Sequence, residues 1–153
     1  MNDVGAIGAA ALAAATVRQA TPLMLAALVG VFSERSGVVN IALEGMMLTG
    51  AFAGMWAAQA AGPWAGLAAA IAVGMGLGLL HLFLTHKLRL DHIVSGVAIN
   101  ILALQATTFL LRVAFNQADP PREARVEQVL PIWFFAALAF ALPVVAYLAL
   151  YRT

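Results

Sequence analysis

Long apolar stretches separated by short polar ones run through the chain. The longest, residues 45–86, contains no formally charged side chain. A transmembrane helix needs about 20 mainly apolar residues, so this stretch is long enough for two crossings. Gly62, Pro63 and Trp64 divide it, because Gly and Pro interrupt helices and Trp favours the membrane interface. We therefore predict spans near residues 42–60 and 65–84.

Two more spans are predicted after this pair. One occupies residues 92–111, and Asp91 is expected to cap its first turn. The other occupies residues 130–151 and contains Pro143, a predicted kink. Between them, residues 116–128 carry alternating charges and two consecutive prolines, which predicts a solvent-exposed loop.

The first apolar stretch, residues 4–32, is interrupted by Arg18 and Pro22. Each part alone is shorter than a full crossing. Two interpretations remain: one long helix kinked at Pro22, or an interfacial segment that ends near Arg18 and is followed by a short span. Arg18 can extend its charged end to the interface in either case. We favour the single kinked or tilted helix.

Composition places the chain among integral membrane proteins. Of its 153 residues, 63% are hydrophobic and 10% are charged, and the mean hydropathy is +0.94. Soluble domains usually carry about a quarter charged residues. The chain is therefore predicted to be an all-α, polytopic transmembrane protein with about five spans in a lipid bilayer. The absence of Cys excludes disulfides and thiolate metal sites, and no basic cluster indicates nucleic-acid binding.

The distribution of cationic residues favours one topology only after weighting. Five alternating spans place Arg35, Lys87, Arg89 and Arg152 on one side, and Arg18, Arg112, Arg122 and Arg125 on the other. The positive-inside rule gives most weight to short loops. Lys87 and Arg89 lie in a short loop, so we predict that residues 86–91 face the cytoplasm.

The most polar passage within these apolar surroundings is residues 33–47. On a helix, Ser36, Asn40, Glu44 and Met47 would share one face, because they are three or four residues apart. Such a stripe predicts either a hydrophilic path for a polar solute, or a helix cap that ties neighbouring helices together. The second interpretation suits Ser36 and Asn40, whereas Glu44 also suits a path, because an isolated carboxylate is costly inside a membrane.

A second polar stripe comprises Gly96, Asn100, Leu104, Thr107 and Thr108, with Gln105 close by. Residues 95–100 are a near copy of residues 36–40, offset by one position. Two similar polar helix starts that face one cavity would be built like the midplane sites of many transporters. The alternative is a chance match in a chain rich in Ala and Val.

Glycines recur at intervals that favour close packing of helices. The pairs Gly50/Gly54, Gly62/Gly66 and Gly74/Gly78 are each separated by four residues. Small residues at this spacing let two helix backbones approach each other. The pattern predicts helix packing without identifying the partner helices.

No residue pattern in the sequence indicates catalysis. His81, His86 and His92 are not accompanied by a carboxylate at ligand spacing, which argues against zinc or haem and favours helix-end or interfacial histidines. The chain has no Ser-His-Asp constellation, phosphate-binding Gly-Lys loop or paired carboxylates. We therefore expect no enzyme activity, no cofactor and no metal.

The passage Ser-Glu-Arg-Ser-Gly-Val-Val-Asn-Ile-Ala-Leu-Glu-Gly-Met-Met-Leu-Thr-Gly-Ala-Phe (33–52) closely resembles a signature of ABC-transporter permease subunits. The family serves ribose-type sugars, branched-chain amino acids and nucleosides, and the passage is most similar to the simple-sugar and nucleoside permeases. Residues 20–23, 91–100 and 151–153 agree with the family pattern in order and spacing. The resemblance covers nearly the whole chain.

This resemblance implies a permease subunit that translocates a nucleoside or simple sugar across the inner membrane by alternating access. It implies three partners: a second permease subunit, a cytoplasmic ABC ATPase subunit, and an extracytoplasmic solute-binding protein or lipoprotein. It also places residues 86–91 in the cytoplasm. Asn40, Glu44 and Asn100 match motif positions and are the candidates for the substrate pathway.

Two features depart from the family pattern. Gln105 and Ala106 stand where relatives tend to carry Gly-Leu, and the chain ends where family members continue into a second half that docks on the ATPase. We expect residues 1–153 to be the N-terminal portion of a single transmembrane permease domain, with the C-terminal half missing. The alternatives are a small oligomeric membrane channel or assembly protein without an ATPase partner, and a membrane-embedded enzyme, for which only Glu44 is available.

Overall fold

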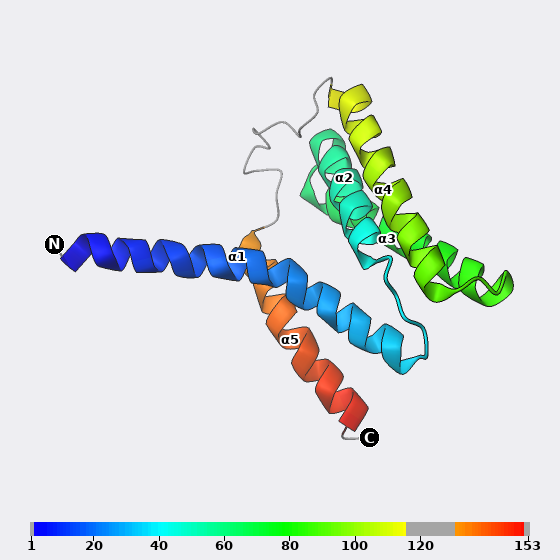
Figure 1. Cartoon of the computed structure of the whole chain (residues 1–153). Coiled ribbons are helices and arrows are strands. Elements are labelled where there is room, and N and C mark those ends of the chain that lie inside the picture. The colour runs from blue at the N-terminus through cyan, green and yellow to red at the C-terminus, as the bar shows by residue number, and fades with distance from the viewer. Residues whose placement is uncertain (1, 116–130, 152–153) are drawn as a thin grey trace. The chain divides into compact units, whose positions relative to one another are not determined.

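The computed structural model describes residues 2–115 and 131–151. These residues form α1 (Asn2–Arg35), α2 (Leu43–Ala61), α3 (Pro63–Leu82), the π-helical turn η1 (Phe83–Lys87), α4 (His92–Phe115) and α5 (Ile132–Tyr151) (Figure 1). The predicted all-α architecture is confirmed, whereas the predicted loop at residues 116–128 lies outside the described residues. Two compact units are present: one contains α1 and α5, and the other contains α2, α3, η1 and α4.

The first unit is built on α1, which is one continuous helix although it contains Pro22. Next to this proline, the buried hydroxyl of Thr21 donates to the carbonyl four residues earlier at 2.7 Å, and so stays satisfied within the helix. Ala11–Arg35 is long and apolar enough to cross a membrane, which confirms the single-helix interpretation. Helix α1 packs against α5, where Ala139 and Ala146 are buried.

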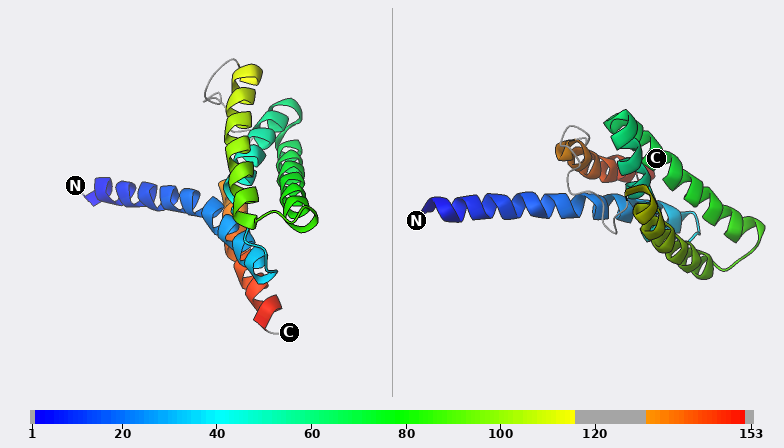
Figure 2. Two further views of the ribbon diagram at one scale, coloured as in Figure 1. Left: turned by 45° about the vertical axis from the view of Figure 1, so that its right-hand side comes forward. Right: turned by 90° about the horizontal axis from the view of Figure 1, so that it is seen from above.

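In the second unit, α2 and α3 form a tight helical hairpin (Figure 2). The predicted break is confirmed: Gly62 has a φ of +89°, which glycine adopts without strain, and Pro63 occupies the first turn of α3. The N–H of Gly62 donates to the carbonyl of Ala58 at 2.9 Å and closes α2. These residues reverse the chain within a single connecting position.

Glycines bring the backbones of α2 and α3 close together. A Cβ at Gly66 would lie 2.6 Å from the carbonyl oxygen of Gly54, closer than two such atoms can approach without a shift. A Cβ at Gly50 would be in ordinary contact with α3. By contrast, a Cβ at Gly74 or Gly78 would meet no described atom within 4 Å. The spacing rule therefore identifies packing positions on α2 and at the start of α3, but not in the second half of α3.

Three described segments are long and apolar enough to cross a membrane: Ala11–Arg35, Pro63–Lys87 and His92–Ala114. Ile132–Leu148 is a shorter apolar helix. The predicted span near residues 42–60 coincides with α2, but α2 is not among these segments. Glu44, Thr49 and Gln59 lower its hydropathy, because their polar side chains interrupt the apolar residues. The multi-pass architecture is confirmed, because several described helices are long and apolar enough to cross a membrane.

The connection between α3 and α4 is short and contains its own backbone hydrogen bond. Arg89 has a φ of +55°, in the left-handed region that ends helices, and the N–H of Leu90 donates to the carbonyl of Leu84 at 3.1 Å. Asp91 then caps α4, because its Oδ1 accepts from the N–H of Ile93 at 2.8 Å. The predicted capping role of Asp91 is confirmed.

Candidate functional site

The polar passage does not form the continuous helical stripe that its spacing predicts. Residues 36–42, which we call the polar segment, are not helical, and α2 begins only at Leu43. Gly37 has a φ of +82°, which interrupts helical geometry directly after α1. Ser36 and Asn40 therefore do not share a helical face with Glu44 and Met47, and that prediction is wrong.

Asn40 explains why the polar segment remains non-helical up to α2. Its Oδ1 accepts from the N–H of Ala42 at 3.0 Å, a local bond two residues ahead that competes with helix formation. Its Nδ2 lies 3.8 Å from the sulfur of Met46. Both ends of this half-buried amide are therefore used within the polar segment and the first turn of α2.

Asn100 of α4 holds the start of α2 from a distant part of the sequence. Its Oδ1 accepts from the N–H of Gly45 at 2.8 Å, and its Nδ2 donates to the carbonyl of Ile41 at 2.9 Å. The residue before α2, Ala42, provides no side-chain cap, so the free amides of the first turn need another acceptor. Asn100 supplies it across the helix interface, and we call this pair of bonds the Asn100 clasp.

Small residues make the Asn100 clasp possible. A Cβ at Gly45 would lie 2.9 Å from Oδ1 of Asn100 and 3.0 Å from the Cβ of Ala103. A Cβ at Gly96 would lie 2.9 Å from the Cβ of Ile41. Ala42 between them is completely buried. Gly45 and Gly96 therefore both serve one close contact between the polar segment, the start of α2 and α4.

The two similar motifs are not structural repeats. Residues 36–40 are non-helical, whereas residues 95–100 lie within α4. They meet instead as partners, because the second motif provides Gly96 and Asn100 to the segment that contains the first. In the predicted second stripe, Thr107 is buried and donates to the carbonyl four residues earlier at 2.7 Å, while Leu104 is exposed. The stripe is thus not one continuous polar face.

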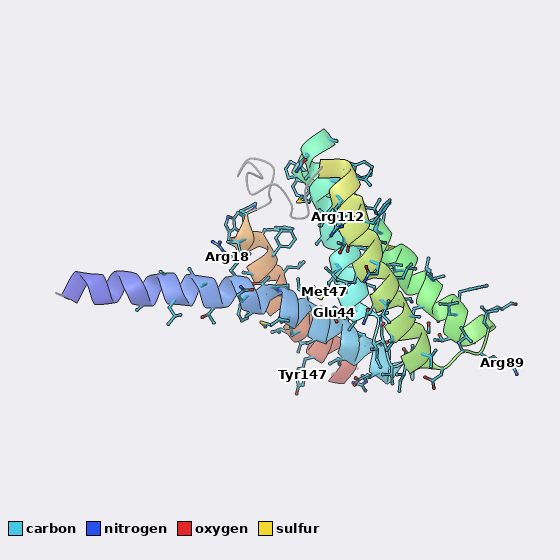
Figure 3. The ribbon with its side chains drawn as sticks, turned by 45° about the horizontal axis from the view of Figure 1, so that its top comes forward. Arg18, Glu44, Met47, Arg89, Arg112 and Tyr147 are labelled. Carbon is cyan, nitrogen blue, oxygen red and sulfur yellow. The ribbon has the colours of Figure 1, made fainter. Side chains whose placement is uncertain are left out.

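Glu44 differs from the two asparagines. It lies in the first turn of α2 (Figure 3), and its side chain is exposed. A carboxylate at this position is favoured by the free N–H groups of a helix start. Among the described residues, no partner atom forms a hydrogen bond or ion pair with this carboxylate. Glu44 is therefore the candidate pathway residue whose polar atoms remain available.

His81, which the sequence predicted to lie at a helix end or an interface, is in the last turn of α3 and is buried. The Nδ1 of His81 is 3.0 Å from Oγ of Ser95, and only 2% of the side chain is exposed. The ring of His92 lies 6.3 Å from that of His81, edge to face. Within the described part of the chain, no cluster of three metal-ligand side chains is present. The His81–Ser95 pair thus joins the end of α3 to the start of α4. The spacing of these two residues in the sequence did not predict this contact.

Comparison with known sequences places this chain in a family. Residues 12–153 match the family described as branched-chain amino acid transport system / permease component. The chain is 49% identical over 112 residues to the guanosine ABC transporter permease protein NupQ of Bacillus subtilis, an alignment that covers 69% of this chain and 35% of that protein. No solved structure is significantly similar to this chain.

Two further relatives have related names. The chain is 44% identical over 102 residues to the putative glucose ABC transporter permease protein TsgC13 of Haloferax volcanii, with 66% of this chain and 31% of that protein covered. It is 40% identical over 108 residues to the nucleoside ABC transporter permease protein NupC of Lactococcus lactis, with 65% and 33% covered. The chain thus spans about a third of the length of the curated relatives it matches.

The family consists of transport permeases rather than enzymes, and the match does not favour a stand-alone channel. It agrees with the resemblance carried by residues 33–52 and with the apolar helices long enough to cross a membrane. The chain is accordingly a multi-pass membrane protein of the branched-chain amino acid transport system / permease component family.

Proposed function

We propose that this chain contributes to the membrane-spanning permease of an ABC importer, which translocates a nucleoside or simple sugar by alternating access. The observation that carries the proposal is the 49% identity over 112 residues to a protein named as a guanosine permease. A second relative is named for nucleosides and a third for glucose. A nucleoside is therefore the favoured class of solute.

The partners follow from the same reasoning. An ABC importer takes its energy from a cytoplasmic ATPase subunit and receives its solute from an extracytoplasmic solute-binding protein or lipoprotein. A second permease subunit would complete the path across the bilayer. The permease itself breaks no covalent bond. This chain would therefore only bind and release a polar solute.

Within this chain, Glu44 is the residue we propose to face the solute path. Its exposed carboxylate can accept hydrogen bonds from the hydroxyl groups of a ribose or hexose. Asn40 and Asn100 are proposed to act through Glu44, because their amides hold the polar segment and the first turn of α2 in place. An exposed carboxylate next to apolar helices is costly unless water or a solute reaches it, which supports the path assignment.

Solute uptake in the organism that carries the gene tests both parts of the proposal. Deleting the gene should abolish uptake of radiolabelled guanosine or glucose and leave leucine uptake unchanged. We assign about 1.4 kcal/mol of solute binding to the Glu44 carboxylate, which corresponds to a tenfold change in affinity. Complementation with Glu44→Ala should therefore restore at most about a tenth of wild-type uptake. Glu34→Gln, which removes a different exposed carboxylate at the end of α1, should restore full uptake.

The two possible failures are distinguishable. Unchanged guanosine and glucose uptake in the deletion strain would overturn the proposed function. Loss of uptake on deletion with full activity of Glu44→Ala would retain the importer and overturn the role of Glu44.

A further inference from the structure

We propose that the connection between α3 and α4, residues 86–91, is a docking surface for anionic phospholipid headgroups. The proposal concerns a surface distant in sequence from the polar segment and does not depend on which solute is carried. Figure 3 shows Arg89 at the outer end of this connection. Three independent observations support it: the length of the helix before the connection, the charge that the connection exposes, and the apolar side chains around it.

The length of the preceding helix places the connection at headgroup level. Trp64, in the first turn of α3, is 66% exposed and suits one membrane interface. Lys87 follows it by 23 residues (87 − 64) along one helical segment, Pro63–Lys87. At a rise of about 1.5 Å per residue, this separation is about 34 Å, slightly more than the roughly 30 Å of hydrocarbon in a bilayer. Lys87 therefore reaches the opposite headgroup region.

Two cations and one carboxylate give the connection a net positive charge. Lys87 and Arg89 are both exposed. Asp91, the acidic residue of the connection, is directed toward α4, where its Oδ1 accepts from the N–H groups of Ile93 at 2.8 Å and Val94 at 3.2 Å. The left-handed backbone at Arg89 fixes the direction in which this cation leaves the chain. The two cations are thus presented outward.

Exposed apolar side chains surround these cations. Leu88 is 53% exposed and Leu90 is 43% exposed, so that apolar and basic residues alternate along the connection. Phe83, Ile93 and Val94, at the adjacent helix ends, are each more than half exposed. Both helices are long and apolar enough to span a bilayer, so these side chains continue the lipid-facing surface. Apolar side chains beside cations are typical of segments that lie in the acyl–headgroup boundary.

Lipid binding to the full 153-residue chain in a neutral detergent tests this proposal. Native mass spectrometry would count bound phosphatidylglycerol and phosphatidylcholine of identical acyl chains. Each cation near an anionic surface contributes about fivefold to affinity. The variant Lys87→Gln/Arg89→Gly should therefore lower the preference for phosphatidylglycerol by about twenty-five-fold. Glycine accepts the positive φ of Arg89, so the turn itself should be preserved, as an unchanged melting temperature would show.

Two controls make the outcome decisive. Arg112→Gln removes an exposed cation at the other end of α4 and should keep the wild-type lipid preference. Arg89→Lys keeps the charge and should also keep it. The proposal is overturned if the double variant binds phosphatidylglycerol as the wild type does, or if Arg112→Gln loses the preference to the same extent.

Discussion

The Asn100 clasp offers a prediction whose magnitude follows from the structure. Asn100→Leu keeps a similar volume and removes both polar atoms, so the N–H of Gly45 and the carbonyl of Ile41 lose their partner. An unsatisfied buried polar group costs about 1–3 kcal/mol. Gly45 is buried, so its amide should lie in the upper half of this range, whereas half-buried Ile41 lets water compensate partly. We expect a total loss of about 3 kcal/mol in the free energy of unfolding.

Two measurements check this value. Unfolding in mixed micelles by denaturant titration gives the change in total free energy. Amide hydrogen exchange at Gly45 reports the local effect, because α2 would lose its tertiary cap. A local cost of about 2 kcal/mol should speed exchange at this amide by about thirtyfold.

A matched control separates the clasp from a general effect of an apolar substitution on α4. Thr108→Val removes a hydroxyl that donates only to the carbonyl of Leu104 in its own helix, at 2.7 Å. It should change stability by less than about 0.5 kcal/mol. The reasoning would be refuted if Asn100→Leu were as stable as wild type and left the exchange of Gly45 unchanged.

Three further predictions concern helix packing and capping. Gly66→Ala should destabilise the α2–α3 hairpin by about 1–3 kcal/mol in thermal unfolding, because its Cβ would lie 2.6 Å from a backbone oxygen. Gly74→Ala, with no described atom within 4 Å of its Cβ, should be neutral or stabilising. Equal melting temperatures of the two variants would contradict the packing. Asp91→Ala should lower the free energy of unfolding by about 1 kcal/mol and speed hydrogen exchange of the first α4 amides. Unchanged hydrogen exchange at these amides would exclude the cap. Ser95→Ala should lower the free energy of unfolding by about 1–3 kcal/mol, because Nδ1 of His81 loses its partner. Ser95→Thr keeps a hydroxyl and should restore most of the stability. An equal loss of stability in both variants would argue against the hydrogen bond.

Much of the architecture could be predicted because membrane helices are encoded by local composition. The break at Gly62–Pro63 and the cap at Asp91 follow from backbone rules that act over a few residues. The continuity of α1 through Pro22 was favoured on similar grounds, because its flanking apolar parts are individually too short to span. These features are determined by local sequence and depend little on contacts with distant parts of the chain.

The site was less predictable, because its geometry depends on contacts between distant residues. Helical periodicity suggested a stripe through Ser36 and Asn40, but Gly37 and the local bond of Asn40 stop the helix there. The bonds from Asn100 to residues more than fifty positions away carry no local sequence signal. Asn100 was still identified as a candidate through the family motif, while its observed contact with the start of α2 required the structure.

The central claim is that Glu44, held at the start of α2, faces the solute path. The chain contains no cysteine, so Glu44→Cys would introduce a single reactive thiol. Its labelling by a membrane-impermeant, hydrophilic thiol reagent should be measured in cells that produce the assembled transporter, with Leu102→Cys as a comparison, because Leu102 is 63% exposed on apolar α4. The account predicts that Glu44→Cys is labelled, that guanosine slows this labelling, and that Leu102→Cys stays unlabelled. Failure to label Glu44→Cys, or labelling at the same rate with and without guanosine or glucose, would contradict it.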